Sequence, residues 1–223
     1  DHNLGAYVSA NGGVRDIGAQ VLYVNRSSRW NWGAAALRLP YASGAISQTL
    51  DTTSDGRLVV REDQEVFRQT DTELRGIVAY PFSRAMRVEF QAGGRRLGFS
   101  REVTSRTFDL SSGELLTDSE QDLAAPGALT FAEASAALVY DQSTFGPTSP
   151  ITGQRYRFEV APSVGSLRFT SVTLDYRRYV PVVRPVTLAV RAMHLARFGG
   201  GAEDPRLSEL FLGYPALVRG YDA

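Results

Sequence analysis

Apolar and polar side chains alternate with a period of two residues along most of this 223-residue chain. Residues 87–93, 155–160, 171–177 and 186–191 show the alternation most clearly, with an apolar residue at every second position. A period of two is the geometry of a β-strand, in which successive side chains point to opposite faces of a sheet. The pattern therefore predicts an all-β chain built from antiparallel strands.

The alternating segments predict nine strands that follow one another in an up-and-down meander. The predicted strands are 3–12, 16–26, 30–39, 65–81, 86–100, 129–141, 154–164, 168–181 and 185–198. Short or turn-rich connections are expected at 27–29, 82–85, 142–153 and 182–184. Long polar connections are expected at 40–64, at 101–128 and from 199 onward, and residues 111–125 have a composition that suggests one short surface helix. Short turns at one end of the strands and long loops at the other are typical of outer-membrane barrels.

The apolar faces of such strands meet either a shared protein core, as in a β-sandwich, or lipid, as in a membrane barrel. Several predicted strands have ten or more residues, which is close to the ~9–11 that a tilted membrane strand needs and long for a sandwich. Aromatic pairs lie near strand ends, where an interfacial girdle would place them. These pairs are Trp30 and Trp32, Tyr80 and Phe82, and Tyr176 and Tyr179.

The polar faces carry charges of both signs in the middle of the strands. On a membrane barrel these side chains would face a water-filled interior and form a ladder of Arg–carboxylate pairs. The chain has no Lys, which suits crowded carboxylate pairing and is also explained by a coding bias. The ladder candidates are Arg87, Glu89, Arg155, Arg157, Glu159, Asp175, Arg177 and Arg191, and Glu73, Arg75 and Arg95 lie on the same kind of face.

Lipid offers no hydrogen bonds to the backbone, so a sheet within it must close into a barrel. Bacterial single-chain barrels have an even number of strands. Because nine is odd, we expect residues 1–223 to form one partial transmembrane β-barrel domain with long extracellular loops, which lacks strands at its C-terminal end.

Composition excludes several other classes of protein. The net charge is zero, so no overall field attracts nucleic acid. The chain has no Cys, and therefore no disulfide, thiolate metal site or Cys nucleophile. No apolar run approaches the ~20 residues of a transmembrane helix. We expect no metal site and no cofactor.

An outer-membrane protease or phospholipase is a weaker alternative, because candidate catalytic groups are few. The chain has two His residues, of which His2 is near the end and His194 falls on the apolar side of its strand. It has no Gly-x-Ser-x-Gly motif. Glu159 and Asp175 could be taken for the carboxylate pair of a glycosidase, but membership of the charge ladder is the favoured interpretation. We therefore predict no catalytic residues and no enzymatic activity.

A motif near the end of the chain adds a resemblance to this pattern. Residues Val218, Arg219, Gly220 and Tyr221 follow a segment, 211–215, that has the sequence FLGYP. The motif resembles the (V/I)-R-G-(Y/F) tip of the long sixth extracellular loop in the bacterial surface antigen family, the BamA-type outer-membrane assembly and translocation barrels. In that family the loop lies between strands 11 and 12 of sixteen, so the nine strands predicted here would correspond to strands 3 to 11.

The resemblance implies a function without covalent chemistry, the insertion or export of polypeptides at the bacterial outer membrane. The implied partners are outer-membrane lipid and unfolded polypeptide clients, and no nucleic acid. It also implies that Arg219 reaches into the barrel interior, toward acidic partners that would lie beyond Ala223. The alternative is a passive outer-membrane pore or a structural barrel, whose interior would also carry mixed charges.

Overall fold

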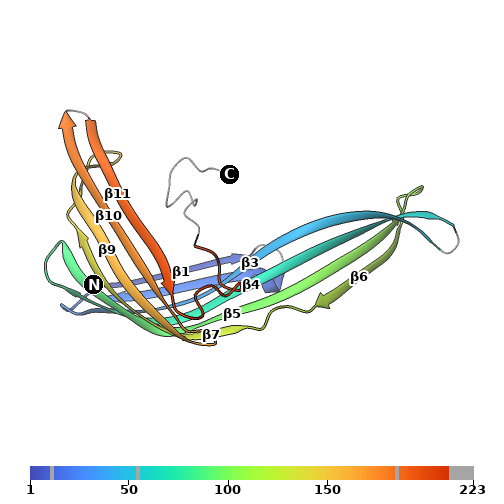
Figure 1. Ribbon diagram of the computed structural model, residues 1–223, viewed down its shortest axis with the longest axis horizontal. Coiled ribbons are helices and arrows are strands. Elements are labelled where there is room, and N and C mark those ends of the chain that lie inside the picture. Colours follow the sequence, from blue (N-terminus) through green and yellow to red (C-terminus); the bar gives the residue numbers. More distant parts are fainter. Residues whose placement is uncertain (11–12, 54–55, 184–185, 211–223) are drawn as a thin grey trace.

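The computed structural model describes residues 1–10, 13–53, 56–183 and 186–210. These residues form eleven strands and one 3₁₀ turn, arranged as one antiparallel sheet (Figure 1). The elements are β1 (His2–Ala10), η1 (Val14–Asp16), β2 (Ile17–Asn25), β3 (Asn31–Thr52), β4 (Leu58–Pro81), β5 (Met86–Asp109), β6 (Leu115–Leu123), β7 (Leu129–Asp141), β8 (Thr144–Phe145), β9 (Pro150–Gly165), β10 (Phe169–Val183) and β11 (Val186–Phe198). The prediction of an all-β, antiparallel fold is confirmed.

The sheet follows the chain as a meander. Its pairing order is β1-β2-β3-β4-β5-β7-β9-β10-β11, and within this order β1 and β11 are the two ends and do not pair with each other. Strand β5 has two neighbours on one side, because its residues 86–97 pair with β7 and its residues 101–108 pair with β6. Each of the nine segments predicted as strands overlaps one strand of this order, while β6 and β8 are additional.

Figure 1 shows that the sheet is strongly curved. Strands β9, β10 and β11 turn up from the plane of β3, β4 and β5, and the segment that follows β11 lies inside the curve. The outer parts of β3, β4, β5 and β6 extend well beyond the rest of the sheet as a long arm. We call the face inside the curve the inner face and the opposite one the outer face.

Three predictions about the long connections are wrong. Residues 101–109, predicted as part of a long connection, are the end of β5 and pair with β4. Residues 40–52 and 58–64 are not loop but continue β3 and β4, which pair without interruption from Asn31↔Ala79 to Thr52↔Leu58. Residues 111–125 contain no helix, because Leu115–Leu123 is strand β6, paired with β5. Backbone hydrogen bonds along the free edge of β5 outweigh the helical preference of this short segment, which is only a weak local preference.

The chain buries little of its apolar surface. Its accessible surface is 14953 Å², against roughly 10,000 Å² expected for a compact protein of this mass. The cluster of buried residues is small and consists of Leu97, Leu129, Phe131, Phe169 and Leu207. Most other large apolar side chains, including those of the central strands, are exposed. No second protein layer covers the sheet in the described part of the chain.

Candidate functional site

The strand register places all eight predicted ladder residues on one face. Direct partners in an antiparallel pair share a face, and Arg87, Val139, Arg157 and Asp175 are joined in one row across β5, β7, β9 and β10. Residues Glu89 and Glu159 occupy the next row on that face, since both pair with Ala137. Arg177 lies between Arg155 and Arg191 in the row on the other side.

One centre of the ladder is the carboxylate of Glu89. It accepts hydrogen bonds from Arg87 Nε and from Arg157 Nη1, both at 2.6 Å. Arg157 also binds Glu159, with an Nε–Oε2 distance of 2.7 Å. Glu89 is only 14% exposed, whereas Arg87 is 44% exposed, so the carboxylate is enclosed by its two guanidinium partners.

A second centre is Asp175. Its Oδ2 lies 2.7 Å from Arg177 Nη2 and 2.9 Å from Arg191 Nη2. Arg155 pairs in register with Arg177 and with Asp141, and it has no ion pair with another described residue. Seven of the eight predicted ladder residues are therefore joined in ion pairs, in two groups.

A third group of ion pairs lies farther along the same face. Its members Glu73, Arg75 and Arg95 were named from the sequence, but Asp71 and Glu133 were not. Arg95 Nη2 is 2.7 Å from Asp71 Oδ2, and Arg95 Nη1 is 3.8 Å from Glu133. Arg75 Nη1 is 3.2 Å from Glu73 Oε1. The sequence pattern contained the signal for Asp71, which is two residues before Glu73 and therefore on the same face.

The segment after β11 packs on this charged face. Leu207 is 8% exposed and contacts the inner-face residues Leu97, Leu129, Phe131 and Phe169. The Arg206 side chain donates to the carbonyl of Gly127 at 3.2 Å, and Arg197 of β11 donates to the carbonyl of Ser208 at 2.8 Å. Residues 199–210 thus cover part of the inner face, inside the curve seen in Figure 1.

The outer face has the opposite character. Its residues Leu74, Val160 and Leu188 are exposed by 65%, 48% and 55%, and nothing in the described part of the chain covers them. Aromatic residues gather at the end with the short turns, where Trp30 contacts Tyr80 with ring centroids 4.8 Å apart. Further ring contacts at that end join Tyr80 and Phe82, Tyr140 and Tyr156, and Tyr156 and Phe158.

The two His residues considered for catalysis are on the opposite face of the sheet from the ladder carboxylates, whereas Glu159 and Asp175 are diagonal neighbours on one face of β9 and β10. His194 pairs with Leu174 in the outer face, and His2 Nδ1 is 2.8 Å from the hydroxyl of Tyr23. The Glu159 and Asp175 carboxylates both bind Arg side chains of the ladder. The described residues contain no cluster of three or more His, Asp or Glu that could hold a metal ion.

The motif Val218, Arg219, Gly220 and Tyr221 lies outside the described residues. Among the helices of the described ranges, none is long and apolar enough to cross a membrane. No protein-family model and no curated protein sequence matches the chain. The resemblance to the bacterial surface antigen family therefore stays a prediction.

Proposed function

We propose that this chain forms part of a β-barrel of the bacterial outer membrane, with lipid against the outer face and water against the inner face. The observation that carries the proposal is the contrast between the two faces. Apolar side chains such as Leu74 are exposed on one, while carboxylates such as Glu89 are enclosed by Arg on the other. In water this arrangement would expose a wide apolar surface, which monomeric soluble proteins rarely do.

The height of the apolar band supports a membrane. On β4 the outer face is apolar or small between Tyr80, in the aromatic end, and Thr72, where polar residues begin. Eight residues of strand span about 27 Å. A tilt of about 40° reduces this to about 21 Å across the membrane, near the ~25 Å band of outer-membrane barrels.

The sheet of the described residues is open, with β1 and β11 as its two edges. Among the described residues, strands β1 and β11 are paired on one side only. Because lipid cannot satisfy the backbone groups of an open edge, the proposed barrel closes through strands additional to those described here.

Within this class, we favour an assembly or translocation barrel over a passive pore. The motif that includes Arg219 is the sequence argument for the first. The packing of Leu207 and Arg206 on the inner face is an independent argument, since a segment in this position would obstruct an open channel. We expect small, unstable currents in planar bilayers, whereas a steady open conductance would favour the pore.

Membrane insertion can be tested with the native fluorescence, because Trp30 and Trp32 are the two Trp residues of the chain. The chain would be refolded into phosphatidylcholine vesicles whose acyl chains carry bromine at a shallow or a deep position. We expect strong quenching by the shallow bromines and weaker quenching by the deep ones, because both indoles lie at the aromatic end of the band. Fluorescence that neither lipid quenches would contradict the membrane assignment.

The assembly role needs a separate test in cells, in the complete protein that contains this chain. Arg219→Ala is expected to lower the amounts of folded outer-membrane proteins, and Arg219→Lys to lower them less. Arg178→Ala, on the outer face of β10, is the matched control. Unchanged outer-membrane protein levels with Arg219→Ala would remove the argument for an assembly barrel and leave the passive pore.

A further inference from the structure

One row of the outer face carries two Arg residues side by side with two Thr residues. Arg38, Thr72, Arg96 and Thr130 are joined by direct pairing across β3, β4, β5 and β7. The row marks the end of the apolar band that is farthest from the aromatic girdle. Neighbouring strands are about 4.8 Å apart, so the backbones of Arg38 and Arg96, which are two strands apart, are separated by about 10 Å.

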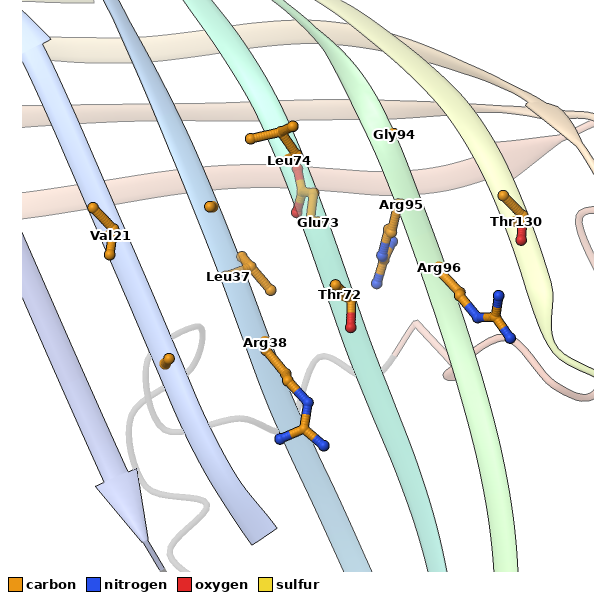
Figure 2. Close-up of a pocket in the computed structure, with 12 residues that line it drawn as sticks. Val21, Leu37, Arg38, Thr72, Glu73, Leu74, Gly94, Arg95, Arg96 and Thr130 are labelled. Atoms are coloured by element: carbon orange, nitrogen blue, oxygen red, sulfur yellow. The ribbon is translucent and has the colours of Figure 1, made fainter. Parts of the chain in front are cut away.

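A depression in the outer face lies directly against this row. Its volume is about 540 Å³, and its apolar lining includes Ala19, Val21, Ala36, Leu74 and Gly94. The depression exists because small residues, such as Ala36 and Gly94, pair on both sides of the larger Leu74. Figure 2 shows the guanidinium groups of the row at the same end of this depression, directed away from Leu74.

Neither Arg38 nor Arg96 forms an ion pair within the described residues, although the Arg38 charge acts on the Asp16 carboxylate at longer range. Arg38 donates hydrogen bonds to the backbone carbonyls of Ile17, at 2.5 Å, and Arg15, at 3.5 Å, which hold the side chain but carry no net charge. Arg96 is exposed, and no carboxylate of the described ranges lies within ion-pair distance of either guanidinium.

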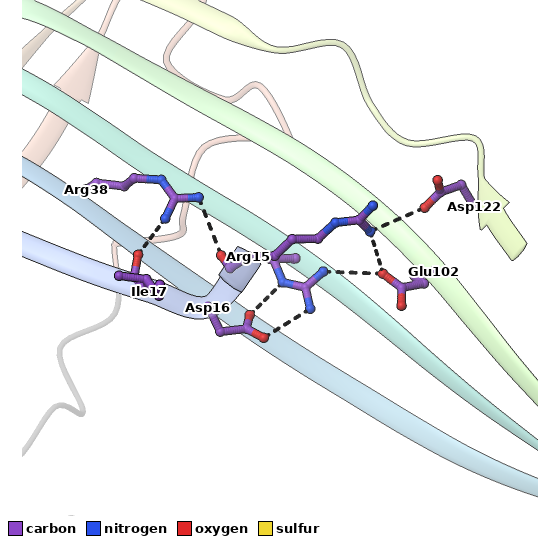
Figure 3. A network of polar contacts seen from close by, with 7 residues as sticks. Arg15, Asp16, Ile17, Arg38, Glu102 and Asp122 are labelled. Carbon is purple, nitrogen blue, oxygen red and sulfur yellow. Dashed lines mark hydrogen bonds and ion pairs between the residues drawn. The ribbon is translucent and has the colours of Figure 1, made fainter. Parts of the chain in front are cut away.

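The neighbouring Arg residues on the same face differ in this respect. Figure 3 shows Arg15 directed at Glu102, 2.8 Å away, and at Asp122, 3.6 Å away. Arg68 binds Asp16 with an Nε–Oδ1 distance of 2.7 Å. This network lies beyond the row, farther from the apolar band, and contains more carboxylates than guanidinium groups. Of these four neighbouring Arg residues, Arg38 and Arg96, which border the depression, are the two without an ion pair to a described residue.

We propose that the row and the depression together bind a phosphorylated membrane lipid. An acyl chain occupies the apolar depression, and the phosphate group accepts hydrogen bonds from Arg38 and Arg96, with the hydroxyls of Thr72 and Thr130 beside them. This inference rests on the proposed function, since it requires the outer face to contact lipid. It adds a specific anionic partner, which an apolar face alone would not select.

The chemistry fits each part of such a lipid. Guanidinium groups bind phosphate through two parallel hydrogen bonds, and two of them at this spacing can reach one headgroup from both sides. A cation at the edge of a low-dielectric layer is costly unless a counter-charge accompanies it. Apart from the Arg and Thr side chains of the row, the outer-face side chains that line the depression are apolar, which matches a hydrocarbon tail.

The test uses the whole chain, refolded in micelles of an uncharged detergent and titrated with bisphosphorylated lipid A, with bound lipid counted by native mass spectrometry. The double variant Arg38→Gln/Arg96→Gln is expected to weaken binding at least about tenfold, the loss typical of charged hydrogen bonds. Arg38→Lys/Arg96→Lys should retain much of the affinity, which separates loss of charge from misfolding. Arg178→Gln removes an exposed outer-face Arg of β10 and should leave binding unchanged.

Two further titrations distinguish the possible ligands. Dephosphorylated lipid should bind at least about tenfold more weakly than lipid A, and inorganic phosphate should not compete at equal concentration. Ala36→Phe fills the depression and should weaken lipid A binding while both Arg residues remain. The proposal is overturned if the Gln double variant binds lipid A as the native chain does, or if free phosphate competes fully. Failure of the membrane assignment itself would be seen separately, as Trp fluorescence that brominated lipids do not quench.

Discussion

Placing a charge at the centre of the outer face is the most direct test of what that face contacts. Val160 is four residues from Tyr156 in the aromatic end of β9 and four from Val164, the last apolar outer-face residue of that strand. It is therefore about 14 Å along the strand from either limit, near the middle of the band. We expect Val160→Arg to place a guanidinium near the bilayer centre.

The magnitude follows from this depth. Arg at the midplane of a membrane barrel costs about 2–4 kcal/mol of folding free energy, which is a roughly 30- to 700-fold change in the folding equilibrium constant. On a face that contacts water, the same substitution at a 48% exposed position would change stability by less than about 0.5 kcal/mol. The two interpretations of the outer face thus differ by a measurable factor.

The assay is reversible unfolding by urea of the chain in phosphatidylcholine vesicles, followed by Trp fluorescence. Ile46→Arg is the matched control, since Ile46 is on the same face but on the arm, 66% exposed and beyond the band. We expect a loss of about 2–4 kcal/mol for Val160→Arg and less than about 0.5 kcal/mol for Ile46→Arg. Equal, small effects of the two substitutions would refute the assignment of the outer face to lipid.

Three other predictions concern separate parts of the sheet. Glu89→Ala leaves two guanidinium groups of the ladder without their shared carboxylate. It should lower the free energy of unfolding by about 1–3 kcal/mol, between the values for exposed and buried ion pairs. Glu89→Gln should lower the free energy of unfolding less in the same urea titration, and equal stability of all three proteins would contradict the ladder. Gly93→Ala would press a methyl group into the backbone of β4 and should cost about 1–3 kcal/mol, whereas Gly94→Ala meets no atom closer than 3.9 Å and should be nearly neutral. The Ser111 hydroxyl and backbone N–H groups lower the pKa of Asp109, in the turn at the end of the arm, from 3.8 to about 2. The carboxylate therefore stabilises the turn above pH 3.8, and this stabilisation is lost as the pH falls through 2. Amide hydrogen exchange of the turn should become faster over that pH range, and Asp109→Ala should abolish this pH dependence.

The strands in which apolar and polar residues alternate could be predicted from the sequence, because the two faces of each strand contact different surroundings. All ladder residues from Arg87 to Arg191 were assigned to one face by parity alone, and the register places them together. Parity requires only the position of a residue within its own strand, so no knowledge of distant pairing was needed.

The arm could not be predicted from the sequence, because its strands have similar surroundings on both faces. Residues 41–52 of β3 are exposed on both faces, so no selection separates apolar from polar positions and the period of two disappears. Strand β6 has the same property, with eight of its nine residues exposed. Its structure depends on backbone hydrogen bonds to β5, which no local sequence pattern encodes.

The packing of the segment after β11 could not be predicted from the sequence either. Leu207 follows Pro205 in a Gly- and Pro-containing segment with no alternation. Its partners, Leu97, Leu129 and Phe169, come from three different strands. Such a contact depends on the curvature of the whole sheet, whereas the ladder depends on parity within single strands.

The length of β4 determines how far the arm projects beyond the Arg row. From Thr72, in the Arg row, the strand continues for fourteen residues to Leu58, about 46 Å along its axis. If the row marks the lipid surface, this stiff projection carries Leu58 and the Asp109 turn far out into the medium. A large particle that approaches the cell would then touch this tip before it touched the bilayer.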